Sequence, residues 1–362
     1  MRAVGSSKII SNREIFFLVL MIQQSGLFWL LPYFLVRGNG TAGLGAVLAG
    51  ILAAICIILI GHYWGRHMPN MGFVTALRQR HAAIGTITGL LFCLWYLLFA
   101  VLILYSFVDA AQKQLLPDTP RIVLCAVIAL LTGWMSKNGL EALARLNMLC
   151  IGSFVLMMTV SIAGTADLFH PEYALPIQIQ NTAQMQEAAV HSVFCYSSLL
   201  SVFMLYPASA DKQTMHKWVL AAVGIGALSL IVWTAYALSV LGQYSLQAVL
   251  WIPIHLVRMV EIGALIDQTE SLFIVLWMAV VMTIGSMFLW CASEGVHQLV
   301  KKQANPYLHW GIALLVFSGM TAIENTMVFL RVDAILAKVM LLFLPVMLGL
   351  TAVLAMKRRE RE

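Results

Sequence analysis

Long apolar runs recur along the chain and constrain its fold more than any other feature. Runs of about 18 or more residues, the length that crosses a hydrocarbon core, follow one another from Ile15 to Met356. They are continuously apolar and do not alternate, which favours helices over a membrane barrel. Charged residues make up 10 % of the sequence, against roughly 25 % in soluble domains. We therefore predict an all-α polytopic membrane protein, with residues 1–362 forming a single integral membrane domain in the lipid bilayer.

The apolar runs divide into about ten predicted transmembrane helices. They cover approximately residues 14–36, 41–62, 84–110, 120–136, 140–166, 187–208, 216–242, 268–297, 307–324 and 334–356. Between them, residues 66–83 have the pattern of a short amphipathic helix on the cytoplasmic surface, and residues 253–266 that of an external helix.

Lys and Arg residues gather in the segments on one side of these spans. Most of the 22 basic residues lie on the side that holds the N-terminus, which the positive-inside rule assigns to the cytoplasm. Both termini are therefore expected in the cytoplasm. The net charge of +6 is confined to helix ends, so it does not indicate a nucleic-acid partner.

The first span contains a polar block near its middle: Gln23, Gln24, Ser25 and Gly26. Irregular backbone at membrane depth survives only where it lines a cavity or is covered by protein. Gly26 weakens a helix, and the neighbouring amides and hydroxyl are suited to hold a ligand. We interpret the block as half of a ligand pocket; the alternative is that these side chains join neighbouring helices.

A second polar cluster, Tyr196, Ser197 and Ser198, lies midway along the sixth span. Ten spans with breaks in the first and sixth match a five-plus-five inverted repeat, here about 14–166 and 187–356, whose half-helix N-termini favour anionic groups. On the third span, Tyr96 and Phe99 are three residues apart and are candidates for a pocket wall.

Charged residues within spans are candidates for a gate. Arg145 and Glu294 both fall on the cytoplasmic side and are a hypothetical inner-gate pair, while Glu270 opens the eighth span. No midspan carboxylate or lysine is an obvious proton carrier, whereas hydroxyls such as Ser286 on the eighth span are suited to sodium. Catalytic and cofactor motifs are missing and the histidines do not cluster at ligand spacing, so we expect no enzyme activity, no cofactor and no metal.

Two segments carry motifs of a known family: Gly139-Leu-Glu-Ala-Leu-Ala-Arg145 is similar to a G-x-E-x-x-A-R segment, and Glu270-Ser-Leu-Phe with Trp277 to an R-L-E-S-L-F…W segment. With these motifs, and in length and span order over nearly its whole extent, the chain resembles the endospore-germination permease family, the B-subunit of nutrient germinant receptors. That family is part of the amino acid/polyamine/organocation transporter superfamily, and the resemblance implies a LeuT-like fold. Ser197-Ser198 stands where the family often has Gly-Glu, and Gln268-Thr269 replaces its Arg-Leu.

The resemblance implies a subunit that binds a small-molecule nutrient, such as an amino acid, in the spore inner membrane. Its implied partners are a membrane A-subunit and a lipoprotein C-subunit. Two alternatives remain open: an ion- or proton-coupled amino-acid transporter, and a structural membrane scaffold.

Overall fold

The computed structural model is helical throughout the residues that it describes. Those are residues 10–67, 71–175, 177, 179, 181–259, 269–300 and 306–356, with side chains not described at 26–29, 269–272, 306 and 355–356. In chain order, with η marking 3-10 helices, the elements are α1 (Asn12–Ile22), α2 (Gly26–Val36), η1 (Gly40–Ala46), α3 (Val47–His67), α4 (Phe73–Arg80), α5 (Ala82–Gln114), α6 (Arg121–Lys137), α7 (Leu140–Gly164), η2 (Ala166–Leu168), η3 (Pro171–Ala174), α8 (Thr182–Tyr196), η4 (Ser197–Ser201), α9 (Val202–Leu205), η5 (Tyr206–Ala208), α10 (Met215–Ala248), α11 (Ile252–Arg258), α12 (Thr269–Val300), α13 (Pro306–Ala322) and α14 (Thr326–Met356).

Among the residues that the structure describes, seven helical segments are long and apolar enough to cross a membrane. They are Gly40–His67, Ala82–Gln114, Leu140–Gly164, Thr182–Ala208, Met215–Ala248, Phe273–Val300 and Thr326–Leu354. The first span is not among them because it is divided into α1 and α2, of 11 residues each. Helices α6 and α13 are not among them because each has only 17 residues.

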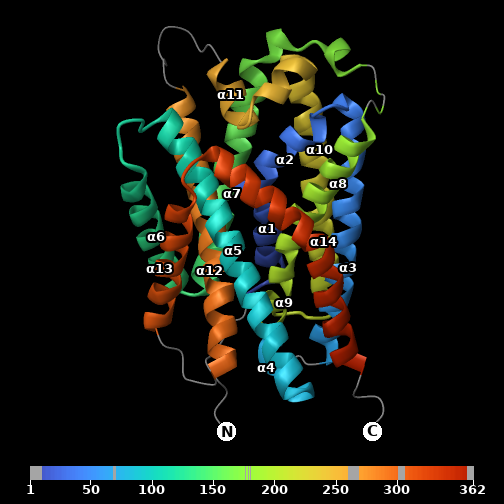
Figure 1. Ribbon diagram of the computed structural model, residues 1–362, viewed down its shortest axis with the longest axis vertical. Coiled ribbons are helices and arrows are strands. Elements are labelled where there is room, and N and C mark those ends of the chain that lie inside the picture. Colours follow the sequence, from blue (N-terminus) through green and yellow to red (C-terminus); the bar gives the residue numbers. More distant parts are fainter. Residues whose placement is uncertain are drawn as a thin grey trace.

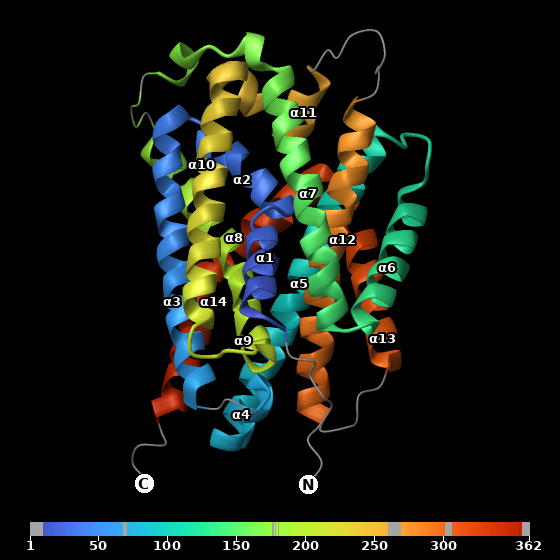
Figure 2. The same ribbon diagram turned by 180° about the vertical axis from the view of Figure 1, so that it is seen from behind.

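The spans form one upright bundle (Figure 1), in which the sixth span, Thr182–Ala208, is the most deeply buried of the seven segments named above. The most apolar stretch of Thr182–Ala208 is 83 % buried, against 22 % for Leu140–Gly164. From behind, α1 and α2 lie between α10 and α7 (Figure 2), and α6 packs beside α13 at one edge. The start of α1 and the end of α14 lie at the same end of the bundle, together with α4.

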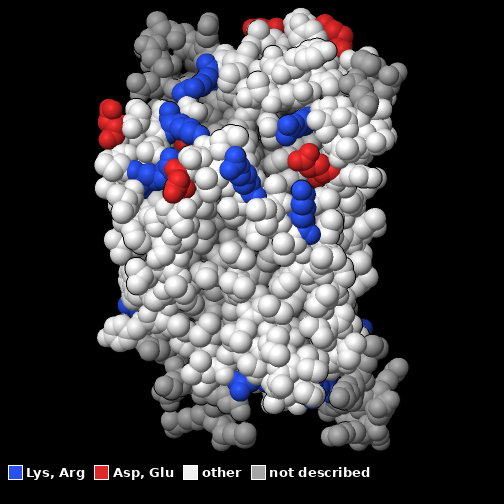
Figure 3. All heavy atoms as spheres, viewed as in Figure 1, with Lys and Arg blue, Asp and Glu red and all other residues white. Residues whose placement is uncertain are grey.

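The outer surface carries a wide uncharged band (Figure 3). Leu149 and Leu342 are 75 % and 78 % exposed, and the charged side chains visible from this side gather toward the two ends. A band of exposed apolar side chains between charged ends is what a surrounding hydrocarbon layer requires.

The end of the bundle that holds α4 is tied together by main-chain hydrogen bonds. The Ile10 amide donates to the Ala208 oxygen across 2.9 Å, and the Ala210 amide donates to the Ile10 oxygen across 2.9 Å. The Asn12 amide group donates to the Asp211 main-chain oxygen across 2.8 Å. These bonds join the beginning of the first span to the end of the sixth.

Several predicted boundaries need correction. The last span was expected at 334–356, but α14 begins at Thr326 and so includes Asp333. The helix expected at 253–266 is present only as α11, and residues 260–268 lie outside the described part. The predicted end of the seventh span at 242 coincides with a kink, where Gly242 has φ of 72° and a second helical piece follows.

Helix α4 confirms the short amphipathic helix expected within 66–83. Its apolar side chains Phe73, Val74 and Leu77 are buried. The Gln298 side chain of α12 accepts from the Val74 amide across 2.9 Å, and the Arg78 guanidinium of α4 donates to the Leu299 main-chain oxygen. The two helices thus supply partners for each other's terminal backbone groups, which an isolated helix leaves unpaired.

Candidate functional site: the interruptions of the first and sixth spans

The first span is interrupted where the sequence predicts it. Gln23, Gln24 and Ser25 form a turn whose amides donate to the Leu20, Met21 and Ile22 oxygens across 3.1, 3.0 and 3.2 Å. Helix α2 then begins at Gly26, and its N-cap residue Ser25 makes no capping side-chain bond. Its hydroxyl donates backward to the Ile22 oxygen across 2.6 Å. The first amides of α2 therefore lack the side-chain acceptor that usually stabilises a helix N-terminus.

The two glutamines of the turn bond to α10. The Gln23 amide group donates to the Ala222 oxygen across 3.0 Å, and the Gln24 amide group donates to the Ser229 hydroxyl across 2.9 Å. A methyl group on Gly226 would lie 2.5 Å from the Gln23 amide atoms. The glycine therefore permits the close approach of α1 to α10, and both glutamine –NH₂ groups serve helix packing.

The sixth span is not broken in the way that the first one is. At Ser197 the chain passes from α8 into the 3-10 segment η4 and then into α9, with helical dihedrals at both junctions. The tighter winding changes the carbonyl partners. The Tyr96 phenol on α5 donates to the Leu200 main-chain oxygen across 2.9 Å, and the Ser197 hydroxyl donates to the Phe194 oxygen across 2.6 Å.

Some buried polar atoms near these interruptions have no hydrogen-bond partner within the described part of the chain. They are the Gln23 side-chain oxygen and the hydroxyls of Ser198 and Ser201. All three residues are no more than 1 % exposed, and α1 contacts η4 directly. Because an unpaired buried polar group costs about 1–3 kcal/mol, such atoms identify places where a polar ligand group would be stabilised.

Two aromatic candidates belong to the packed core. Phe99 lies between Trp95, Phe194 and Phe288, with ring centroids 5.3–5.4 Å away. The Tyr196 ring approaches α3 so closely that a methyl group on Gly50 would lie 2.3 Å from it. Both residues pack around the sixth span, and their role in a pocket stays a prediction.

The predicted pair of Arg145 and Glu294 is not formed. Arg145, whose side chain is 71 % exposed, bonds instead to Glu141 one helical turn away across 2.5 Å. Glu294 accepts from the Gln298 side chain across 3.0 Å. Each side chain has a partner within its own helix in this structure, and a gate role for the two residues stays a prediction. Glu270 lies in the first turn of α12, among the residues whose side chains are not described.

The structure contains buried charged groups that the sequence interpretation missed. Asp333 on α14 lies with its Oδ2 atom 3.0 Å from Nδ1 of His191 on α8, and their side chains are 2 % and 3 % exposed. Asp109 on α5 is also buried, 3.0 Å from the Lys113 amine. Asp333 falls just outside the last predicted span, 334–356, because the apolar run begins after it, whereas in the structure it lies in the first third of α14.

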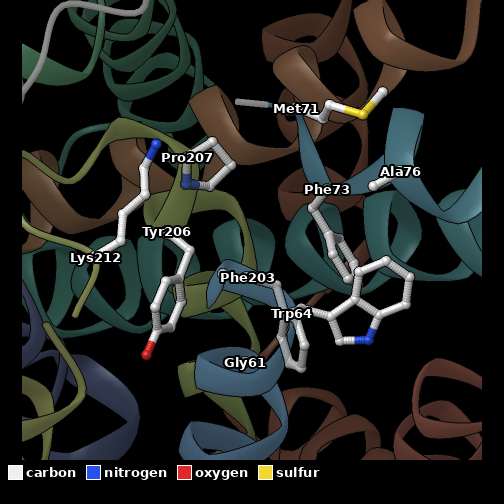
Figure 4. Close-up of a pocket in the computed structure, with 10 residues that line it drawn as sticks. Gly61, Trp64, Met71, Phe73, Ala76, Phe203, Tyr206, Pro207 and Lys212 are labelled. Carbon is white, nitrogen blue, oxygen red and sulfur yellow. The ribbon is translucent and has the colours of Figure 1, made fainter. Parts of the chain in front are cut away.

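A narrow cavity lies at the end of the bundle that holds α4 (Figure 4). It is lined by Gly61, Trp64, Gly65, Met71, Phe73, Ala76, Phe203, Tyr206, Pro207 and Lys212. Burial lowers the pKa of Lys212, which lies at its edge. None of the predicted ligand residues lines this cavity, so it is separate from the interruptions.

The divided first span and the tightly wound sixth span belong to an all-helical bundle with apolar spans. Its fold is similar to that of a Na⁺-coupled sialic acid symporter in a substrate-bound outward-open state, with a TM-score of 0.65 and 15 % identity, over 98 % of this chain and 80 % of that one. The family model described as spore germination protein matches residues 9–329, and the chain belongs to that family.

Two proteins of Bacillus subtilis (strain 168) are similar in sequence. Spore germination protein KB is 22 % identical over 377 residues, which cover 97 % of this chain and 96 % of that protein. YfkT, whose name also assigns it to spore germination, is 22 % identical over 250 residues, 67 % of each chain. Together with the seven apolar helices, the family identifies an integral membrane protein.

Proposed function

We propose that this protein is a germinant-receptor subunit that binds a small nutrient between its first and sixth spans. Ligand binding would shift the balance between two arrangements of the bundle, and partner subunits would respond to that shift. The proposal includes ten spans in two inverted repeats of five, both termini in the cytoplasm of the spore, and an A-subunit and a lipoprotein C-subunit as partners.

The observation that carries this proposal is the set of buried, unpartnered polar atoms beside the interruptions. The Ser198 and Ser201 hydroxyls and the Gln23 side-chain oxygen offer both donors and acceptors. Next to them, the uncapped N-terminus of α2 presents amides and the positive end of a helix dipole. This combination suits a zwitterionic nutrient such as an amino acid, whose carboxylate would take the place of the missing cap.

Within this proposal the site residues divide into two groups. Gln23, Ser198 and Ser201 would contact the nutrient, and Gly26 would supply backbone amides. The remaining candidates would hold the site in shape: Gln24, Ser25, Tyr96, Phe99, Tyr196 and Ser197. Of these, Gln24, Ser25, Tyr96 and Ser197 use a polar side-chain group in bonds within the protein.

A proton-coupled amino-acid transporter is the second candidate function. The buried pair of His191 and Asp333 favours it, because intramembrane titratable groups often mark proton pathways. The third candidate is a structural scaffold, which the bonds of Gln23 and Gln24 to α10 favour. Uptake of labelled amino acids by proteoliposomes tests the transporter, because accumulation driven by an ion gradient would not occur with a receptor alone.

The decisive experiment compares germination of spores with and without this protein, against single nutrients. Spores that lack it should fail to respond to at least one nutrient. Complementation with Ser198→Ala or Ser201→Ala should then raise the nutrient concentration needed for half-maximal germination about tenfold, if each hydroxyl contributes about 1.4 kcal/mol. The matched control is Ser161→Ala on α7, whose buried hydroxyl bonds its own helix at the Met157 oxygen.

Protein amounts in the spore membrane must be equal in all these strains. A normal response of the Ser198 and Ser201 variants at equal amounts would contradict ligand binding at this place. It would leave the scaffold interpretation as the better account of the polar residues.

A further inference from the structure

We propose that His191 and Asp333 form a proton-binding site, and that the bound proton holds α8 against α14. This inference goes beyond the proposed function, because it concerns a proton and does not need a nutrient. The two side chains come from opposite ends of the second half of the chain. They meet inside the bundle, where each is almost completely shielded from the surroundings.

The geometry supports a loose ion pair that depends on a proton. Nδ1 of His191 lies 3.0 Å from Oδ2 of Asp333, but Oδ2 receives no well-aligned hydrogen bond. The contact is therefore an ion pair by its short distance, without an aligned hydrogen bond. A neutral imidazole would leave a buried carboxylate with no compensating charge, which is costly in a low-dielectric interior. A proton on the second ring nitrogen, Nε2, converts the same contact into an electrically neutral pair.

The imidazole also lies flat against a phenyl ring of α2. The ring centroids of His191 and Phe34 are 3.5 Å apart and their planes differ by 7°. A cation over an aromatic face is attracted by the ring quadrupole, so Phe34 favours the protonated imidazole too. The proton would therefore stabilise the junction of α2, α8 and α14 at once, and its loss would weaken that junction.

Other ionisable groups on the packed elements modify this site. Cys195, one turn further along α8, is electrostatically coupled to Asp333. The remaining titratable or charged groups on the neighbouring stretches of α5, α8, α14 and α2 with its C-cap residue are Tyr33, Arg37, Tyr105, Asp109, Lys113, Glu187, Tyr196, Arg331 and Lys338. Helix α3 packs against α8 around Gly50, where residues 47–54 carry no titratable group. Asp109 is compensated by Lys113 and by the Thr326 hydroxyl at 2.8 Å. Asp109 is therefore a buried carboxylate like Asp333, but it has a lysine beside it in place of a histidine.

The test measures the protonation of His191 in the full-length chain in lipid nanodiscs. Protein with ¹⁵N-labelled histidine is followed by nuclear magnetic resonance between about pH 5 and about pH 9, where histidine charge can change. His191→Gln assigns the resonance. We expect His191 to be an imidazolium at the acidic end and to lose its proton within this range. Asp333→Asn should shift that transition to lower pH, and Asp109→Asn should leave it in place.

Each other outcome of the titration overturns the proposal. A neutral imidazole throughout the range means that the site binds no proton, and an imidazolium throughout means that the proton is not exchanged. A transition unchanged by Asp333→Asn means that the carboxylate is not part of the site. The wild-type titration requires no variant to fold.

A second measurement tests the link to helix packing. Cys195 and Cys150 are both 4 % exposed, and their labelling by a thiol reagent is compared by mass spectrometry at one fixed pH. Asp333→Asn and His191→Gln should each increase labelling of Cys195 several-fold relative to Cys150 in the same chain. The double variant, in which two amide groups that can bond to each other replace the charged pair, should return toward the wild-type ratio. Equal ratios in all four proteins would separate proton binding from packing and contradict the proposed link.

Discussion

The Tyr96 phenol of α5 donates a hydrogen bond to the main-chain oxygen of Leu200 across 2.9 Å, 104 positions away in sequence. Leu200 lies in η4, the stretch where the sixth span winds more tightly. A change of helix type alters the pairing of carbonyls, and those left over need other partners at membrane depth. A side chain from another span thus supports the local backbone on which the candidate site is built.

The first prediction is that Tyr96→Phe lowers stability, because the Leu200 oxygen loses its buried donor. We expect a loss of about 1–3 kcal/mol in the free energy of unfolding, measured with the full chain in mixed micelles. Tyr105→Phe on the same helix is the control: Tyr105 is also fully buried, but its hydroxyl has no partner. If both variants lose stability equally, the Tyr96 bond is not the cause.

The second prediction concerns the bond from the Gln24 amide group to the Ser229 hydroxyl. Gln24→Leu and Ser229→Ala should each destabilise the chain, and the double variant should lose less than the sum of the two. We expect an interaction free energy of about 0.5–1.5 kcal/mol from this cycle. Additive losses would mean that the two side chains act independently, and that the turn at Gln23–Ser25 is not held through Ser229.

How much the sequence could predict depends on how far apart the interacting residues lie. The interruption of the first span depends on neighbouring residues alone, because four polar or flexible residues follow one another in an apolar run. The sequence therefore predicts its position correctly. The serines of the sixth span indicated an irregularity. Its form was beyond prediction, because a carbonyl of η4 finds its partner, the Tyr96 phenol, on another span.

Asp333 is the clearest limit of the sequence interpretation. Hydropathy is averaged over neighbouring residues, so the charges of Asp333 and Arg331 lower the mean hydropathy at the beginning of α14. This stretch was therefore left outside the predicted span. The partner, His191, lies 142 positions earlier on a different helix. No local pattern connects the two residues, and only the packing of α8 against α14 brings them together. Arg145 shows the reverse case: its ion pair is with Glu141, one turn away on the same helix, and not with the distant Glu294.

The third prediction uses two glycines of α10 that are two residues apart. Gly226→Ala should displace the Gln23 amide group from the Ala222 oxygen, because the added methyl group would lie 2.5 Å from that amide. Overpacking of this kind costs about 1–3 kcal/mol, which exceeds the helix-propensity gain of about 1 kcal/mol. Gly224→Ala meets nothing within 4 Å and should be neutral or slightly stabilising. Thermal unfolding of both variants in one detergent checks the difference, and equal melting temperatures would argue against the close approach.

The last prediction concerns the loop that ties the first span to the sixth. Hydrogen bonds from the Thr214 side chain and the Gln213 backbone lower the pKa of Asp211 below its usual value. Because this pKa is lower in the folded protein, the bonds stabilise the loop above the ordinary Asp value of about 3.9, and that contribution is lost as the pH falls through the folded value. The Asp211 main-chain oxygen accepts from Asn12, so the link at Ile10 should loosen in acid.

Hydrogen exchange at the Ile10 and Ala210 amides, corrected for intrinsic rates, measures this loosening. Both amides bond across the link in the folded chain, and their protection should decrease below about pH 4. Asp211→Asn should show reduced protection already at neutral pH and little further change in acid. Its side chain cannot ionise, so the hydrogen bonds from Thr214 and Gln213 have no carboxylate to stabilise. Asp118→Asn, in the loop between α5 and α6, should behave as the unaltered chain does. Acid-independent protection in the unaltered chain would mean that the Asp211 carboxylate does not hold this end of the bundle together.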